Sequence, residues 1–99
     1  MTAAIYAKNF DKAKKKLEDI IYWYSFKCYQ MERQYDEHNE IMAVQFDNGD
    51  TWMAMSYNPS RTCGRRYNIV YIDKELTPDE ELNIKLCLTN PPFQAYNFY

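Results

Sequence analysis

The sequence predicts a small α+β domain with the element order α-β-β-β-α, and three observations support this prediction. Apolar residues recur every three or four positions over residues 9–36, which is typical of a long N-terminal helix. Alternating apolar residues on both sides of an Asn-Gly pair indicate a β-hairpin over residues 41–57. Four consecutive apolar residues within the segment 68–73 then predict a central strand there. The chain has 99 residues, which is enough for one domain, residues 1–99, and too few for two.

The first predicted helix would begin at Asn9, whose side chain can accept a hydrogen bond from the backbone of the first turn. At ~1.5 Å per residue it would be about 40 Å long, and it would pack on the small sheet. In helical projection Tyr22, Phe26 and Tyr29 fall almost opposite the apolar stripe, and Arg33 continues their line. We therefore expect the outer face of this helix to contact a partner, a second copy of the chain or the C-terminal tail.

The hairpin is expected to turn at Asn48 and Gly49, which can supply the two positive φ angles of a two-residue type I′ turn. In this register Phe46 lies opposite Thr51, and the face that carries Phe46 is the core face. Trp52 falls on the other face, which is only half apolar. Trp52 is therefore a candidate contact residue.

A second, shorter helix is predicted to begin at the segment Thr77-Pro78-Asp79-Glu80. Thr77 is the expected N-cap, Pro78 suits the first helical position, and Glu80 closes a capping box. The prolines at positions 91 and 92 end this helix, because proline lacks the backbone donor and clashes with a continuing turn. The aromatic tail, residues 93–99, is expected to add a strand or to wrap the core.

Composition excludes several classes of protein and of site. The 12 basic and 14 acidic residues give a net charge of −2, so bulk charge does not argue for nucleic acid. Apolar runs are too short to span a bilayer, which needs about 20 residues. Three widely spaced cysteines and one histidine do not suit a closed zinc site. We expect reduced thiols, no cofactor or metal, no membrane contact and a cytoplasmic location in a bacterial host cell.

Residues 41–75 resemble part of the ATPase core of phage terminase large subunits. The similarity lies in the hairpin and in the string 64–73, where four apolar residues precede Asp73 as in a Walker B strand. It implies a viral or mobile-element lineage more than an activity. No glycine-rich phosphate loop is present, since the chain has only two glycines, and Lys74 stands where a terminase places its catalytic Glu. We therefore predict that the chain is not an enzyme. The alternative, an enzyme that uses magnesium at Asp73, is a weaker hypothesis than a non-enzymatic protein.

Together these patterns predict a non-enzymatic phage or mobile-element binding protein that occludes a bacterial protein or protein–nucleic acid complex. An inhibitor of a host defence system, such as an anti-CRISPR protein, is one concrete version. Self-association through the first helix is a further expectation. The alternative is a nucleic-acid-binding accessory protein, related to a degenerate terminase module, that uses a basic loop beside aromatic residues. The expected partner-binding residues are Tyr22, Phe26, Tyr29, Arg33 and Trp52, and the expected phosphate-binding residues of the alternative are Arg61, Arg65 and Arg66.

Overall fold

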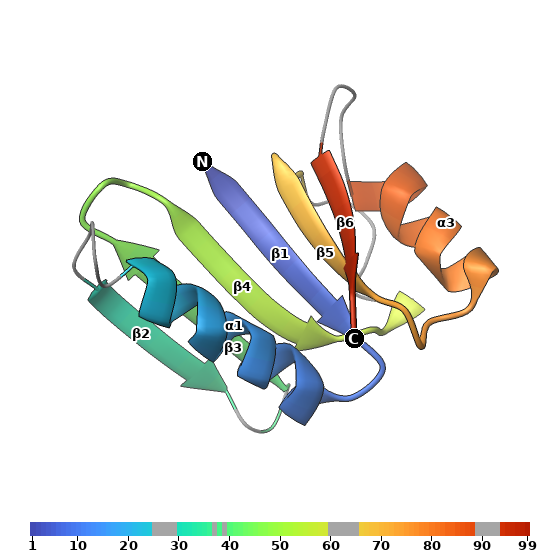
Figure 1. Ribbon diagram of the computed structural model, residues 1–99, viewed down its shortest axis with the longest axis horizontal. Coiled ribbons are helices and arrows are strands. Elements are labelled where there is room, and N and C mark those ends of the chain that lie inside the picture. Colours follow the sequence, from blue (N-terminus) through green and yellow to red (C-terminus); the bar gives the residue numbers. More distant parts are fainter. Residues whose placement is uncertain (25–29, 37, 39, 60–65, 89–93) are drawn as a thin grey trace.

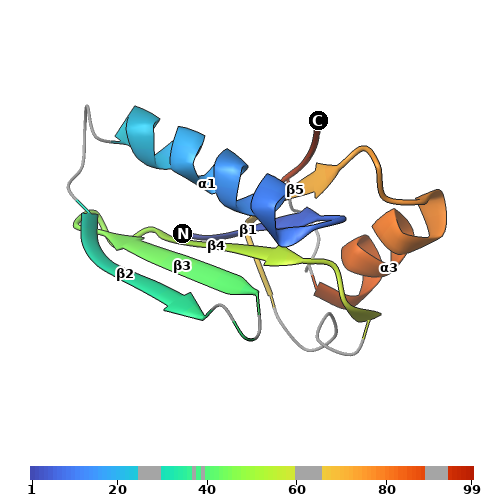
Figure 2. The same cartoon turned by 90° about the horizontal axis from the view of Figure 1, so that it is seen from below.

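The computed structural model describes residues 1–24, 30–36, 38, 40–59, 66–88 and 94–99. It shows one mixed sheet with helix α1 on one face and helix α3 on the other (Figures 1 and 2). The α+β class is therefore confirmed, whereas the predicted element order is not. In chain order the elements are β1 (Thr2–Ala7), α1 (Phe10–Tyr24), β2 (Gln30–Asp36), β3 (Ile41–Phe46), β4 (Thr51–Ser56), β5 (Ile69–Asp73), α3 (Pro78–Leu88) and β6 (Gln94–Phe98).

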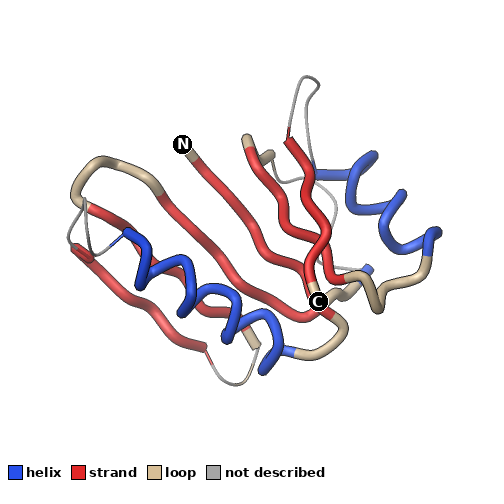
Figure 3. The backbone as a smooth tube through the Cα atoms, in the orientation of Figure 1, coloured by secondary structure: helices blue, strands red, loops and turns tan. Residues whose placement is uncertain are grey.

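The sheet has six strands in the order β2-β3-β4-β1-β5-β6 (Figure 3). Strand β3 is antiparallel to both β2 and β4, while β1 is parallel to both β4 and β5, and β5 is parallel to β6. The strand β1 at the centre was not predicted. Its residues Ala3 to Ala7 are buried on both faces, which is typical of a strand inside a parallel sheet.

The long predicted helix over residues 9–36 is wrong at its C-terminal half, because α1 ends at Tyr24 and residues 30–36 form β2. Helices depend on tertiary packing for their stability, and within the described residues α1 buries Phe10, Ala13, Leu17 and Ile20. Beyond it, the backbone of β2 pairs with β3 as an edge strand. The N-terminal cap is confirmed, since the Lys12 N–H donates to Asn9 Oδ1 at 2.9 Å.

The hairpin of β3 and β4 is confirmed, but its register differs from the prediction by one residue. The Phe46 N–H donates to the carbonyl of Asp50 at 2.9 Å, and the Gly49 N–H donates to the carbonyl of Phe46 at 3.0 Å. The loop therefore has three residues, with Gly49 at φ +91°, as in a type I turn followed by a glycine bulge. Asn48 Oδ1 accepts the Asp50 N–H at 2.9 Å and holds this turn.

The changed register moves Trp52 to the α1 face of the sheet. Trp52 pairs with Val44, so its side chain shares the face of Val44 and Phe46, because a slip of one residue reverses every side chain of a strand. The indole is only 4 % exposed. The expectation that Trp52 stands on a half-apolar outer face is therefore wrong.

The second helix and the tail follow two of the sequence expectations. The Thr77 N–H donates to Glu80 Oε1 at 2.9 Å and the Glu80 N–H donates to Thr77 Oγ1 at 3.2 Å, which is the predicted capping box. Ile84 of α3 is buried against the sheet, in a cluster with Tyr6 and Ile72. The tail adds the edge strand β6 rather than wrapping over α1. Within the described ranges, neither helix is long and apolar enough to cross a membrane.

Candidate binding surface

Exposed aromatic side chains are concentrated on the side of the sheet that carries α1. Two of them stand in the last turn of the helix, where Tyr22 is 65 % exposed and Trp23 is 71 % exposed. The sequence predicted Tyr22 as a contact residue but did not predict Trp23. Phe26 and Tyr29, which were expected beside them, lie outside the described residues.

The flank of α1 that faces β2 is held by an ion pair and an aromatic contact. The Arg33 guanidinium contacts the Glu18 carboxylate through two nitrogens, at 3.2 and 3.3 Å. Next to it, the Lys14 ammonium lies 4.8 Å from the ring centroid of Tyr35, and the Tyr35 ring is 5.7 Å from that of Phe10. Arg33 is therefore exposed as predicted, but it stands on strand β2 and not on the first helix.

The opposite flank of α1 faces β5 and β6 and carries a second set of lysine–aromatic contacts. Tyr71 and Tyr96 are register partners on the two strands, and their ring centroids are 5.3 Å apart with 30° between the planes. The Lys16 ammonium lies 5.1 Å from the Tyr71 centroid and 5.9 Å from that of Phe98. Burial, together with the neighbouring Tyr96, raises the pKa of the Tyr71 hydroxyl, so the Tyr71 ring stays neutral at ordinary pH.

These rings continue an aromatic row that begins in the core. Tyr24 stacks on Phe46 at 4.2 Å, and its hydroxyl accepts a hydrogen bond from the Trp52 indole N–H at 3.2 Å. The Trp52 and Tyr71 centroids are 5.8 Å apart, although β1 runs between their strands. Trp52 pairs with Ala3 on β1, and that small side chain leaves room above the strand. The row therefore runs from buried rings to Tyr96, which is 45 % exposed at the sheet edge.

The arginine loop of the alternative hypothesis lies almost entirely beyond the described part of the chain. Arg66 is exposed and precedes the buried Tyr67. Arg61 and Arg65 fall outside the described residues. Trp52 lies in the core under α1.

Asp73, the residue at the Walker B-like position, is buried at the C-terminal end of β5. Its Oδ1 accepts hydrogen bonds from the Lys12 ammonium and from the Glu75 N–H at 2.9 Å, and its Oδ2 accepts the Lys8 N–H at 3.0 Å. The carboxylate thus joins β5 to the connection between β1 and α1. Among the described residues, no group of three or more His, Cys, Asp or Glu side chains could hold a metal ion.

The carboxyl groups of Asp73 and Asp50 make the stability of the fold sensitive to acid. Burial alone would raise the pKa of Asp73, but hydrogen bonds from Lys12 and from the backbone of Lys8 and Glu75 outweigh burial and lower it below 3.8. Burial alone would also raise the pKa of Asp50. Hydrogen bonds from the Tyr24 hydroxyl and the Asn48 amide contribute to lowering this pKa instead. Ionised Asp73 and Asp50 therefore stabilise the folded state above the unfolded pKa of about 3.9, and this stability is lost as the pH falls through the folded pKa.

We expect the urea midpoint of unfolding to be constant from about pH 7 to pH 5 and to decrease steadily below about pH 4. The measurement is a series of urea titrations followed by circular dichroism between pH 7 and pH 2.5. Because other carboxyl groups also titrate in this range, the Asp73→Asn variant is the control, and its decrease should be shallower. An equal acid dependence in wild type and variant would contradict the assignment to Asp73.

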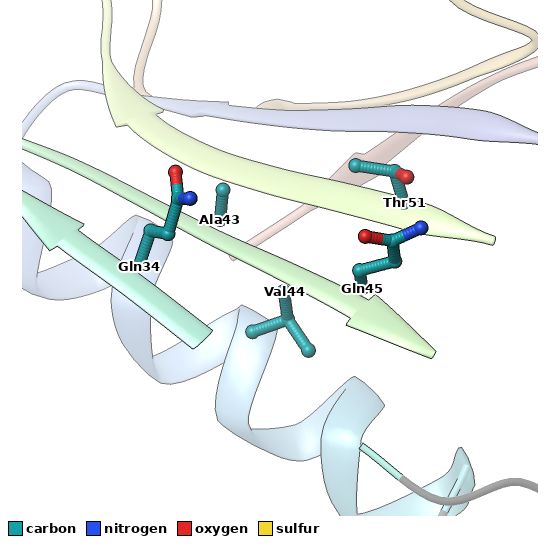
Figure 4. Close-up of a pocket in the computed structure, with 5 residues that line it drawn as sticks. All are labelled: Gln34, Ala43, Val44, Gln45 and Thr51. Atoms are coloured by element: carbon teal, nitrogen blue, oxygen red, sulfur yellow. The ribbon is translucent and has the colours of Figure 1, made fainter. Parts of the chain in front are cut away.

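The sheet face opposite α1 is hollowed where it is formed by β2, β3 and β4. Figure 4 shows Gln34, Ala43, Gln45 and Thr51 on this side, whereas Val44 points toward α1. A neighbouring hollow shares part of this lining, and Asp36 is the carboxylate among its residues. Neither lining brings together a nucleophile and a base, so the described residues of this face offer no catalytic arrangement.

Comparison with known proteins adds no relative: no protein-family model, curated protein or solved structure matches this chain. The terminase resemblance therefore stays a prediction. Sequence reasoning did not find the contact between Tyr71 and Tyr96, since it depends on the parallel pairing of β5 with β6. The one related signal was the aromatic tail, residues 93–99, which was expected to add a strand or to wrap the core.

Proposed function

We propose that the chain is a non-enzymatic binding protein whose partner is another protein, contacted through the last turn of α1. The observation that supports this is the exposure of two consecutive large aromatic side chains, Tyr22 at 65 % and Trp23 at 71 %. Aromatic and arginine side chains are the residues that most often dominate the binding energy of protein interfaces. Glu18 precedes Tyr22 by one helical turn, so the pair of Glu18 with Arg33 borders the same surface.

The non-enzymatic part of the proposal is supported by the contacts of Asp73. The only part of the sequence with an enzymatic resemblance centres on this residue, and its oxygens are occupied by Lys12 and by two backbone N–H groups. A carboxylate in this position is well explained as a structural connection. The narrower role, a phage or mobile-element inhibitor that occludes a bacterial protein or protein–nucleic acid complex, stays a prediction from the sequence. So do cytoplasmic location and self-association through α1.

Replacing Tyr22 and Trp23 by alanine, singly, is expected to weaken partner binding by about 30-fold or more for the residue that anchors the interface. The free energy of unfolding should change by less than about 0.5 kcal/mol, because exposed side chains contribute little to stability. Wild type and variants serve as baits in bacterial lysate, the recovered proteins are identified by mass spectrometry, and affinity for the purified partner is measured by calorimetry. Urea unfolding supplies the stability.

The matched control is Leu86→Ala on α3, because Leu86 is 73 % exposed and lies on the other side of the sheet. It should recover the same proteins as wild type. If both aromatic variants also bind those proteins with unchanged affinity, the proposed surface is wrong. A stability loss of several kcal/mol in the aromatic variants would instead assign these side chains to the core.

A further inference from the structure

Strand β2 is an edge of the sheet, and within the described part of the chain it pairs only with β3. Figure 1 shows it at the side of the sheet farthest from α3. Pairing is regular over residues 32–36, after a register shift between Gln30 and Glu32. The side chains from Arg33 to Asp36 are all exposed. The outer side of β2 therefore presents backbone N–H and C=O groups that no strand among the described residues pairs.

The outward backbone groups of β2 belong to Arg33 and Tyr35. The Phe46 N–H donates across the hairpin to β4 at 2.9 Å, so Phe46 turns its backbone groups toward β4. These groups alternate along a strand of an antiparallel pair, and Ala43 therefore turns its groups toward β2. Gln34 is the register partner of Ala43, so its groups face β3. Arg33 and Tyr35, on either side of Gln34, then face away from the sheet.

This alternating row of donors and acceptors selects an extended polypeptide strand as its occupant. A second strand matches each outward N–H with a carbonyl and each outward carbonyl with an N–H. A polyanion would accept hydrogen bonds from the N–H groups only, and it would leave the outward carbonyl oxygens next to negative charge. The chemistry of this edge therefore favours a strand over a nucleic acid.

The side chains of β2 alternate between the two faces of the sheet. Arg33 and Tyr35 face α1, which they reach through the ion pair and the ring contact described above. Gln34 lies on the opposite face, in the hollow that Figure 4 shows, and Asp36 shares that face by alternation. A strand added to β2 would therefore meet polar side chains on the hollowed face, and these side chains decide its register.

A second copy of the chain fits this edge about a two-fold axis in one register. Two antiparallel copies must pair outward groups with outward groups, so the axis passes through a residue and not between two. An axis at Glu32, Arg33 or Asp36 sets a charged residue opposite itself, which is unfavourable. An axis at Gln34 sets Glu32 opposite Asp36, two acidic residues. An axis at Tyr35 avoids both conflicts: it sets the tyrosine opposite its copy and Gln34 opposite Asp36.

We propose that β2 is a dimerisation strand, through which two copies of the chain pair antiparallel about a two-fold axis at Tyr35 and form one continuous sheet. The outward backbone groups of the two Tyr35 residues bond to each other, and each Gln34 amide donates to the Asp36 carboxylate of the second copy. Helix α1 packs on β4 and β1, so β2 and β3 of both copies separate the two helices. The interface uses neither Tyr22 nor Trp23 and stands apart from the proposed protein-binding surface.

The test is sedimentation velocity of the whole chain at concentrations from about 1 μM to 1 mM. We expect a monomer–dimer equilibrium for wild type. Gln34→Glu should weaken dimerisation by about ten-fold, because it sets two pairs of like charges opposite each other, and Gln34→Lys should strengthen it by several-fold. The double variant Gln34→Glu, Asp36→Lys restores opposite charges in this register alone, so it should recover the affinity of wild type. A general loss of folding cannot produce changes in opposite directions.

Amide hydrogen exchange measured by NMR reads the same interface at the backbone. The Tyr35 amide should exchange more slowly as the protein concentration rises, because its outward N–H becomes bonded in the dimer. The Gln34 amide already bonds to β3 and should not respond to concentration. Exchange at Tyr35 that is independent of concentration would contradict the proposed pairing.

The other edge strand supplies the matched control. Gln94 on β6 is exposed and is also a glutamine, so Gln94→Glu and Gln94→Lys make the same charge changes away from β2. Both should leave the sedimentation of the protein unchanged, and so should Tyr22→Ala and Trp23→Ala. Urea unfolding of each variant confirms that it is folded.

Four results would overturn the proposal. A wild-type monomer over the whole concentration range would leave the edge to a strand of another protein. Equal weakening by Gln34→Glu and Gln34→Lys would place the axis at Gln34. A dimer that responds to the Gln94 variants would be assigned to β6, and a dimer lost in Tyr22→Ala or Trp23→Ala would be assigned to α1. The proposed protein-binding surface is tested separately, since its variants are read by capture of a partner and not by sedimentation.

Discussion

Asp73→Ala is expected to destabilise the fold by about 3 kcal/mol, a large share of the 5–15 kcal/mol that holds an ordinary domain together. The side chain is fully buried, and its removal leaves the Lys8 and Glu75 N–H groups without their acceptor. It also leaves the Lys12 ammonium beside a space that its counter-ion occupied. Lys12 is partly exposed and can turn toward solvent, which places the loss at the lower end of the range for broken buried pairs.

Urea unfolding of Asp73→Ala, Asp73→Asn and Glu75→Ala measures this contribution. Glu75 is the matched control, because its carboxylate is 3.7 Å from the same Lys12 ammonium but is 60 % exposed, so its loss should cost about 1 kcal/mol or less. The asparagine variant keeps the shape and one acceptor oxygen, and it should lie between the two. A loss below about 1 kcal/mol in Asp73→Ala would contradict the structural role.

The same variants separate the structural role of Asp73 from the terminase resemblance. A Walker B-like Asp binds magnesium, so Mg²⁺ would raise the melting temperature of wild type and not of Asp73→Asn. If the carboxylate serves only as the connection between β5 and the β1–α1 junction, Mg²⁺ shifts neither protein.

Local signals predicted the elements that are determined locally. The caps at Asn9 and Thr77 depend on side-chain to backbone bonds within three residues, and both are present. The apolar run at residues 69–73 is a buried strand, as its composition indicates. The hairpin also forms where Asn48 and Gly49 predict it, although a single added loop residue decides which face Trp52 occupies.

Non-local pairing explains what the sequence did not predict. Strand β1 contains three alanines, which have low β propensity, and it is a strand because it pairs with residues 51–56 and 69–72, far along the chain. The three-to-four-residue spacing of apolar side chains continues past Tyr24 by coincidence. Tyr35 fits this spacing, but in the structure it lies on the α1-facing side of strand β2. The contact between Tyr71 and Tyr96 likewise needs β6 to pair with β5, which a local pattern does not specify.

Trp52→Ala is expected to destabilise the fold by about 3–5 kcal/mol, because it removes the central ring of the aromatic row. The indole is 4 % exposed, lies between the rings of Tyr24 and Tyr71, and donates a hydrogen bond to the Tyr24 hydroxyl at 3.2 Å. Little around it can collapse into the space, since the adjoining side chain on β1 is Ala3. Trp52→Phe should lose about 1–2 kcal/mol, because a smaller ring remains and the donor is absent.

The chain supplies its own control for this experiment, since it has only two tryptophans and the other, Trp23, is 71 % exposed. Trp23→Ala should change the free energy of unfolding by less than about 0.5 kcal/mol while it weakens partner binding. The sequence-based expectation makes the opposite assignment, with Trp52 as a contact residue on an outer face. Equal stability of wild type and Trp52→Ala in urea, together with a loss of partner affinity, would restore that expectation and would require the two-residue turn. A large stability loss that Trp52→Phe partly recovers assigns the side chain to the core, and it leaves Tyr22 and Trp23 to form the contact surface.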